Sequence, residues 1–147
     1  MGKLVSIGCR SIVTAAGGAT LEILGLGTYK PRIRRIEFSQ VTAVAGTYGL
    51  GFAAAAGVTP TTPATLLEER ATTYDPKTRI ALAWGTPPTV PDAFFRRATC
   101  AAAVGAAVVW DFGSEGLQMD DVVATSSLVL WVIATAPVLD INIVVDE

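Results

Sequence analysis

The sequence predicts a single all-β domain, folded as a sandwich or a barrel. Three observations support this: strict alternation of apolar and polar residues near the C-terminus, a β-branched apolar run before it, and glycines and prolines that separate short β-rich segments. A chain of 147 residues has the length of about one domain. With 51% hydrophobic and 16% charged residues, its composition excludes intrinsic disorder, which requires low hydrophobicity and high net charge.

The C-terminal residues give the clearest strand signal. Leu139, Ile141, Ile143 and Val145 share one parity, and the polar residues Asp140, Asn142 and Asp146 share the other. Because successive side chains of a strand point to opposite faces, this segment has one buried face and one solvent face. The preceding run, Leu128–Ile133, is apolar on both parities, so we expect a strand that is covered on both sides.

Shorter β-rich segments precede these two strands. The segment Arg32–Gln40 is expected to form a strand with Ile36 and Phe38 pointing inward. Glycines and prolines separate the remaining candidates, as in sandwiches and barrels. Those candidates are Leu4–Val13, Thr20–Leu24, Thr47–Ala55, Leu66–Thr73, Ala98–Ala103 and Ala106–Phe112.

Helix is expected at one place at most. The alanine runs 53–56 and 101–107 favour helix by propensity, but nearby glycines interrupt them, so we expect strand or irregular structure there. One short helix is predicted near Pro91–Arg97. The proline-rich stretch Asp75–Asp92 is predicted to be a long excursion rather than a pair of strands, and such loops often carry function.

The residue types needed for most catalytic and metal sites are scarce. The chain has no histidine, so the commonest general base and the commonest metal ligand are both absent. Cys9 and Cys100 form no C-x-x-C motif, which excludes a zinc site. Cys100 is expected to be a buried, inert thiol, and a Cys9–Cys100 disulfide stays open. We expect no catalytic residue, no cofactor and no metal.

Two local patterns resemble parts of ligand-binding motifs, but the residues around them do not complete those motifs. Residues Gly49–Ala54 match the G-x-G-x-x-A pattern of dinucleotide-binding loops, yet Gly57 and Pro60 would end the required helix almost at once. A glycine-rich strand or turn is expected instead. The acidic pairs Glu68–Glu69 and Asp120–Asp121 lack the spacing of a calcium loop and are expected to be solvated.

Charge is unevenly distributed along the chain. The net charge is −2, which argues against a basic nucleic-acid binder. Residues 1–50 nevertheless hold six basic and two acidic side chains, whereas the remainder holds five and eleven. By parity, Arg32 and Arg34 lie on one strand face and Arg35 on the other. Because complementary patches fix register between subunits, these three arginines are predicted to contact acidic patches of a neighbouring chain.

The uncharged run Val122–Leu139 approaches the length of a membrane-spanning helix. Its hydroxyl residues, its β-branched content and Pro137 favour strands, so we expect a soluble protein without a membrane partner.

Several segments together suggest a family. They are Arg34–Ser39, Leu66–Thr73, Val109–Phe112 after the proline-rich stretch, and the closing pair Leu128–Ile133 and Ile141–Glu147. In the order and residue character of these segments, residues 30–147 resemble the small jelly-roll proteins of tailed-bacteriophage virions, particularly head decoration proteins. The resemblance implies an all-β jelly-roll sandwich of the tumour-necrosis-factor type, a homotrimer, and binding to the outside of the capsid lattice. Residues 1–29 do not match, and would form an N-terminal arm or the first strands.

The apolar run Leu128–Ile133 points to assembly independently of the resemblance. It has more apolar surface than one sandwich core needs, and large exposed apolar patches are rare on monomers. Val129, Trp131 and Ile133 are therefore the predicted subunit-interface residues.

The sequence-based hypothesis is a non-enzymatic virion protein that trimerises and decorates or stabilises a phage capsid. It would be made in the host cytoplasm, would lie on the capsid exterior and would have the major capsid protein lattice as its partner. Alternatives are a head-fibre or tail-associated subunit, or a lectin-like jelly roll that binds a ligand.

Overall fold

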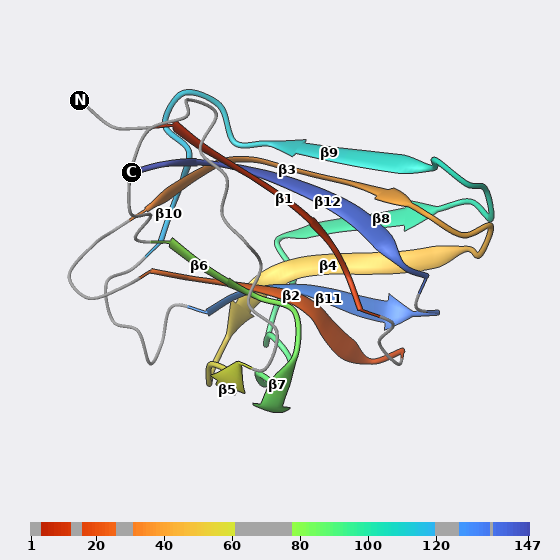
Figure 1. Cartoon of the computed structure of the whole chain (residues 1–147), viewed down its shortest axis with the longest axis horizontal. Coiled ribbons are helices and arrows are strands. Elements are labelled where there is room, and N and C mark those ends of the chain that lie inside the picture. Colours follow the sequence, from red (N-terminus) through yellow and green to blue (C-terminus); the bar gives the residue numbers. More distant parts are fainter. Residues whose placement is uncertain (1–3, 13–15, 26–30, 61–77, 120–126, 136) are drawn as a thin grey trace.

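The described part of the computed structural model consists of strands and irregular segments, with no helix. It covers residues 4–12, 16–25, 31–60, 78–119, 127–135 and 137–147. Its twelve strands form two five-stranded sheets and one two-stranded ribbon, and all pairings are antiparallel. The two sheets lie face to face as the layers of a sandwich (Figure 1).

The first sheet runs in the order β1-β12-β3, and β9 and β10 pair successively with the other edge of β3. Its strands are β1 (Leu4–Arg10), β12 (Leu139–Asp146), β3 (Arg32–Gln40), β9 (Ala107–Asp111) and β10 (Leu117–Gln118). The second sheet runs in the order β6-β2-β11-β4-β8. Its strands are β6 (Thr78–Ala81), β2 (Gly18–Gly25), β11 (Ser127–Ala134), β4 (Gly46–Ala53) and β8 (Arg96–Cys100). The ribbon consists of β5 (Val58–Pro60) and β7 (Trp84–Thr86).

This strand order is that of a jelly roll, as predicted. The sets β1-β12-β3-β9 and β2-β11-β4-β8 form two facing antiparallel sheets, and consecutive strands mostly alternate between them. The alternation begins at β1 and β2, so the described part of residues 1–29 supplies the first strand of each sheet.

The core lies between the two sheets and is built from the inward parity of each strand. Phe38 packs edge-to-face against Tyr48 and Trp110, with ring centroids 4.9 and 5.2 Å apart. The Gln40 side-chain amide donates a 3.0 Å hydrogen bond to the Tyr48 hydroxyl and so links β3 to β4 across the core. Burial of such a contiguous apolar cluster is the main force that holds sheets together.

Each predicted strand that falls on described residues overlaps an observed strand, and Leu66–Thr73 lies outside those residues. The prediction Ala98–Ala103 is wrong in its second half, because β8 ends at Cys100 and the chain then turns. The prediction of a short helix near Pro91–Arg97 is wrong, because the chain is irregular up to Phe95 and β8 begins at Arg96. Pro91 and Ala93 pack directly on Gly51 of β4, and the Phe95 N–H donates to the Leu50 carbonyl, so pairing with β4 outweighs local helix propensity.

The proline-rich stretch is also more regular than predicted. Its described part contains β6, which joins the second sheet beside β2, and β7, which pairs with β5. Prolines are tolerated here because Pro87, Pro88 and Pro91 lie outside both strands.

Candidate assembly surfaces

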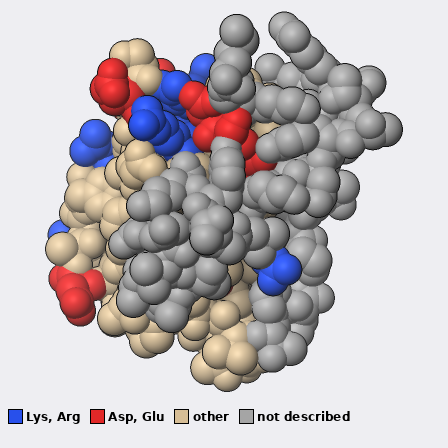
Figure 2. Space-filling model, turned by 90° about the vertical axis from the view of Figure 1, so that its left-hand side faces the viewer, with Lys and Arg blue, Asp and Glu red and all other residues tan. Residues whose placement is uncertain are grey.

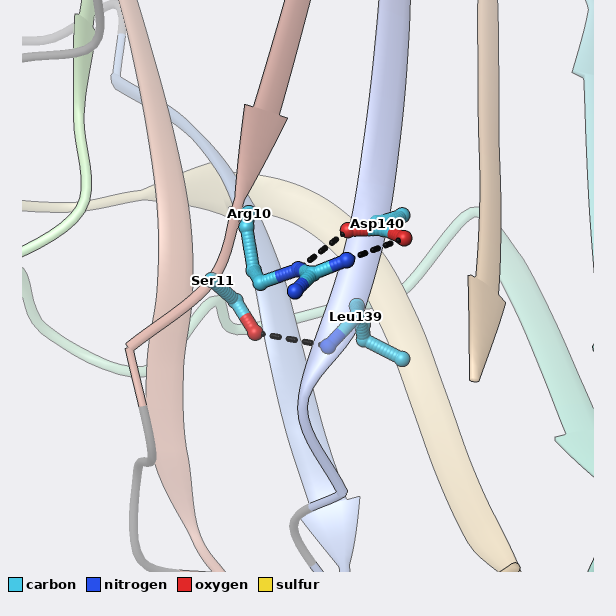
Figure 3. Close-up of polar contacts among 4 residues, drawn as sticks. All are labelled: Arg10, Ser11, Leu139 and Asp140. Atoms are coloured by element: carbon cyan, nitrogen blue, oxygen red, sulfur yellow. Dashed lines mark hydrogen bonds and ion pairs between the residues drawn. The ribbon is translucent and has the colours of Figure 1, made fainter. Parts of the chain in front are cut away.

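The outer face of the first sheet carries most of the cross-strand ion pairs. Arg10 of β1 and Asp140 of β12 are opposite each other in register, and the guanidinium donates two hydrogen bonds of 2.6 and 2.9 Å to the carboxylate (Figure 3). Beside this pair, the Leu139 N–H donates to the Ser11 hydroxyl at 2.9 Å, and the Ser11 N–H donates to the Leu139 carbonyl. These bonds fix the end of β1 against β12.

A β-bulge corrects the predicted orientation of the arginines on β3. The register between β3 and β12 shifts where Val144 pairs with Arg35 and Val145 pairs with Ile33, so Arg34 is the additional residue. A bulge places two residues opposite one and resets the alternation. Arg35 therefore lies on the outer face with Arg32 and Arg34, and the parity argument was wrong for it.

All three arginines have partners within the chain. Arg34 forms an ion pair with Asp146, Arg35 forms one with Glu37, and the Arg32 side chain donates to the Gln118 side chain at 3.2 Å. Figure 2 shows cationic and anionic side chains lying side by side at the end of the molecule that carries both termini. Contact of these arginines with a neighbouring chain stays a prediction.

Two carboxylates of this face have lowered pKa values. The Asn142 side chain donates a 2.9 Å hydrogen bond to Glu37, and this bond together with that from Arg35 lowers the Glu37 pKa. The hydrogen bonds from Arg10 lower the Asp140 pKa in the same way. Both groups are therefore anionic at neutral pH, and the face alternates between cations and anions.

Two shallow depressions lie on this outer face. One, of about 340 Å³, is lined by side chains of β3, β9 and β12 that include Ser39, Val109 and Asn142. The other, of about 560 Å³, lies nearer the termini and is lined by Leu4, Arg34, Asp111 and neighbouring residues. Val109 is 56% exposed, although it lies on a strand of the sandwich. No other described strand covers this face.

The outer face of the second sheet is different because the chain itself covers part of it. Leu128, Leu130 and Val132 of β11 point into the core, so Val129, Trp131 and Ile133 share the outer face as parity predicts. Val129 forms a small cluster with Ala19 and Ala53, against which Trp84 and Trp131 pack.

Val129 is fully buried within the chain, so its prediction as an interface residue is wrong. The physical reason is that the β5–β7 ribbon brings Trp84 over this part of the sheet. Trp131 and Ile133 are half-buried, and for them the interface stays a prediction.

Sequence reasoning missed a buried carboxylate on the same face. Glu22 of β2 is fully buried and accepts a 2.6 Å hydrogen bond from the Trp84 indole N–H and a 2.9 Å bond from the Gly57 N–H. The Ser127 hydroxyl donates to the same carboxylate. No described cation pairs with it, so these three neutral donors are the partners of the buried carboxyl group. The cluster ties the β5–β7 ribbon to β2 and β11.

The cysteines are free in this structure. Cys9 lies on β1 at one edge of the first sheet, and Cys100 lies on β8 at an edge of the second. The Cys9–Cys100 disulfide, which the sequence left undecided, is therefore not formed. Burial, with a contribution from Asp140, raises the pKa of Cys9 to about 11, and burial raises the pKa of Cys100. Both thiols are protonated and unreactive at neutral pH.

The glycine motif is part of a strand. Gly49 and Gly51 lie within β4, where the Phe94 ring and the Ala93 carbonyl occupy the space that their side chains would need. This packing accounts for both glycines without a nucleotide. The pairs Glu68–Glu69 and Asp120–Asp121 lie outside the described residues.

Two further kinds of functional element are absent from the described residues. No group of three or more cysteine, aspartate and glutamate side chains there could hold a metal ion. No helix in those ranges is long and apolar enough to cross a membrane. Comparison of the whole chain with protein-family models, with curated proteins and with solved structures found no match.

Proposed function

We propose that this chain is a non-enzymatic structural subunit that assembles into a homotrimer and decorates or stabilises the exterior of a phage capsid. The family resemblance of residues 30–147 to head decoration proteins supports the role, and the jelly-roll fold is compatible with it. Folds host many functions, so the proposal needs support from a surface.

The observation that carries the proposal is the difference between the two outer faces. The second sheet is partly covered by the β5–β7 ribbon, whereas the outer face of β1-β12-β3-β9 has no described element over it. That face combines exposed aliphatic side chains, among them Leu4 and Val109, with an alternating set of cations and anions. Mixed apolar and charged surfaces of this kind suit contacts that need a fixed register between copies.

In a trimer, each copy would present the same surface to the capsid. Three weak contacts held on one rigid unit raise the overall affinity without any single contact being strong. A decoration protein needs this property because it must bind a repetitive lattice and remain soluble before it does so.

The first test is a pair of matched substitutions read by static light scattering. We expect Val109→Glu to reduce the mass from three chains to one, because it puts a charge into the proposed contact between copies. Val104→Glu is the control, since Val104 is 70% exposed but lies in the turn before β9. Equal masses for both variants would contradict the assignment of the contact between copies to this face. Loss of the trimer in Ile133→Asp alone would assign that contact to the second sheet.

The second test addresses the capsid. Co-sedimentation with capsids that lack the chain, from the phage that encodes it, is expected to carry the protein into the pellet at a fixed ratio to the capsid subunit. Absence of binding would rule out decoration and favour a fibre or tail subunit.

A lectin-like function is the second candidate, because the depression beside Val109 is lined by Ser39, Asn142 and the carboxylates of Glu37 and Asp140. Such groups can hydrogen-bond sugar hydroxyls. Binding on a glycan array that is lost in Asn142→Ala would favour this function over decoration.

A further inference from the structure

Strand β8 carries two arginines whose environment differs from that of the arginines on the first sheet. Arg96 and Arg97 are both exposed, and neither forms an ion pair with a described carboxylate. Each lies over an aromatic ring instead: Arg96 is 5.5 Å from the centroid of Phe112, and Arg97 is 5.7 Å from that of Phe94. The Arg96 guanidinium also donates a 3.1 Å hydrogen bond to the Phe95 carbonyl. A guanidinium that stacks by its face presents its remaining N–H groups at its edge, where they can bind an anion.

Exposed aromatic rings lie beside these arginines. Phe52 of β4 and Phe95 stack with their centroids 5.7 Å apart and an interplanar angle of 27°. They are 37% and 39% exposed, so this stacked pair is partly open to solvent. We call the surface formed by Phe52, Phe94, Phe95, Arg96 and Arg97 the β8 patch.

The patch lies at a sheet edge. Among the described strands β8 pairs only with β4, so its other edge has no strand partner. Arg96 and Arg97 are adjacent on the strand and therefore point to opposite faces of it. An extended segment that runs along this edge could reach both guanidinium groups.

Protection of the edge explains only part of this arrangement. Charged side chains on an edge strand discourage pairing with other chains, which would account for the two arginines. It does not account for a stacked, partly exposed pair of phenylalanines beside them. Arginine and aromatic residues together are the types that are enriched in protein interfaces and their hot spots.

The charges identify the chemistry of the partner. A nucleic acid would need a longer basic track, whereas the patch offers two cations on a chain of net charge −2. A second copy fits less well. Among its described carboxylates, those of Asp92 and Glu115 are exposed but stand singly in a bend and a turn, whereas Glu22, Glu37, Asp140 and Asp146 have partners within the chain. An acidic segment of another protein fits best.

We propose that the β8 patch binds an acidic, extended segment of a second protein. Carboxylates of two consecutive residues, which point to opposite faces of an extended segment as the two arginines do, would pair with Arg96 and Arg97. An apolar side chain beside them would pack on Phe52 and Phe95. This inference goes beyond the proposed function, since it requires neither a trimer nor a capsid.

The test uses fluorescence anisotropy of a labelled peptide in which pairs of glutamates alternate with pairs of valines. The same peptide with lysine in place of glutamate is the charge-reversed probe. The wild-type protein is expected to bind the acidic peptide only, and more weakly as salt increases. Replacing both residues, Arg96→Gln with Arg97→Gln, should weaken binding by roughly tenfold or more, because each charge-assisted contact is lost. Arg79→Gln is the matched control, since Arg79 is an exposed arginine on β6 at the opposite edge of the same sheet.

The double lysine variant, Arg96→Lys with Arg97→Lys, keeps the charge and should retain part of the affinity, which separates binding from folding. The proposal is overturned if the wild type does not bind the acidic peptide, or if the glutamine variant binds it as tightly as the wild type. It is also overturned if an oligothymidine binds in place of the peptide. A smaller mass of the glutamine variant in light scattering would assign the patch to contact between copies. If the trimer test fails while the peptide still binds, only the proposed function is lost.

Discussion

At the scale of single residues, Glu22 is the one acidic residue that is buried in the described part of the chain. Its carboxylate is buried beside the apolar cluster of the second sheet and depends on three hydrogen-bond donors. A buried polar group that loses a hydrogen-bond partner is costly, so removal of any one donor should lower the free energy of unfolding. The bonds from Trp84 and Gly57 also hold the ribbon that buries Val129.

Glu22→Gln tests this dependence. Whichever way the amide is placed, its NH2 group would face a donor, either the Trp84 indole or the Gly57 N–H. We expect a loss of about 2–3 kcal/mol in the free energy of unfolding, measured by urea denaturation. Glu37→Gln, which changes a half-exposed carboxylate, should cost about 1 kcal/mol or less. Equal midpoints for the two variants would contradict the role of Glu22.

Cys9 predicts how stability depends on alkaline pH. Its pKa is raised from 9.0 to about 11 in the folded chain, so ionisation of the thiol favours the unfolded state between these values. The contribution of Cys9 is fully present below pH 9 and is lost as the pH rises to about 11. Cys9→Ala should therefore reduce the fall in melting temperature over that interval. The fall will not disappear, since the pKa values of Tyr48 and Cys100 are also raised by burial. An unchanged pH profile would contradict the assignment to Cys9.

At the scale of elements, alternation predicted β3 and β12 because each has one buried face. Strand β11 was predicted from its continuous apolar run, and most of its residues are buried on both faces. The alternation argument failed at Arg35, since a bulge at Arg34 interrupts the alternation and depends on pairing with a strand about a hundred residues away. The short strands β6 and β7 were missed because three or four residues are too few to show a period. Glu22 had one local signal, an acid between the apolar residues Leu21 and Ile23, but its partners are 35, 62 and 105 positions away.

The packing of the Pro91–Phe95 segment on β4 yields a test at this scale. A side chain at Gly51 would overlap the Ala93 backbone carbonyl, and this atom cannot move without displacing the segment that leads into β8. We expect Gly51→Ala to lower the free energy of unfolding by about 1–3 kcal/mol, as overpacking does. Gly8→Ala is the control, because nothing lies within 4 Å of a Cβ at Gly8 of β1. A difference in calorimetric melting temperature between the variants is predicted, and its absence would contradict the tight packing.

At the scale of the whole molecule, the sandwich has two unlike outer faces. The β5–β7 ribbon covers part of the second sheet and is held there through Glu22. The outer face of the first sheet is exposed and combines ion pairs with aliphatic side chains. The sequence could predict that β11 has an apolar outer face, but not that the chain itself would bury Val129. That cover shifts the proposed contact between copies from β11 to the β1-β12-β3-β9 face.

The mass of the purified protein in solution tests the central proposal most directly. Static light scattering at micromolar concentration is predicted to give about three times the chain mass of 15.3 kDa, unchanged on moderate dilution. A single species of 15.3 kDa under the same conditions would contradict assembly through the open face of the first sheet.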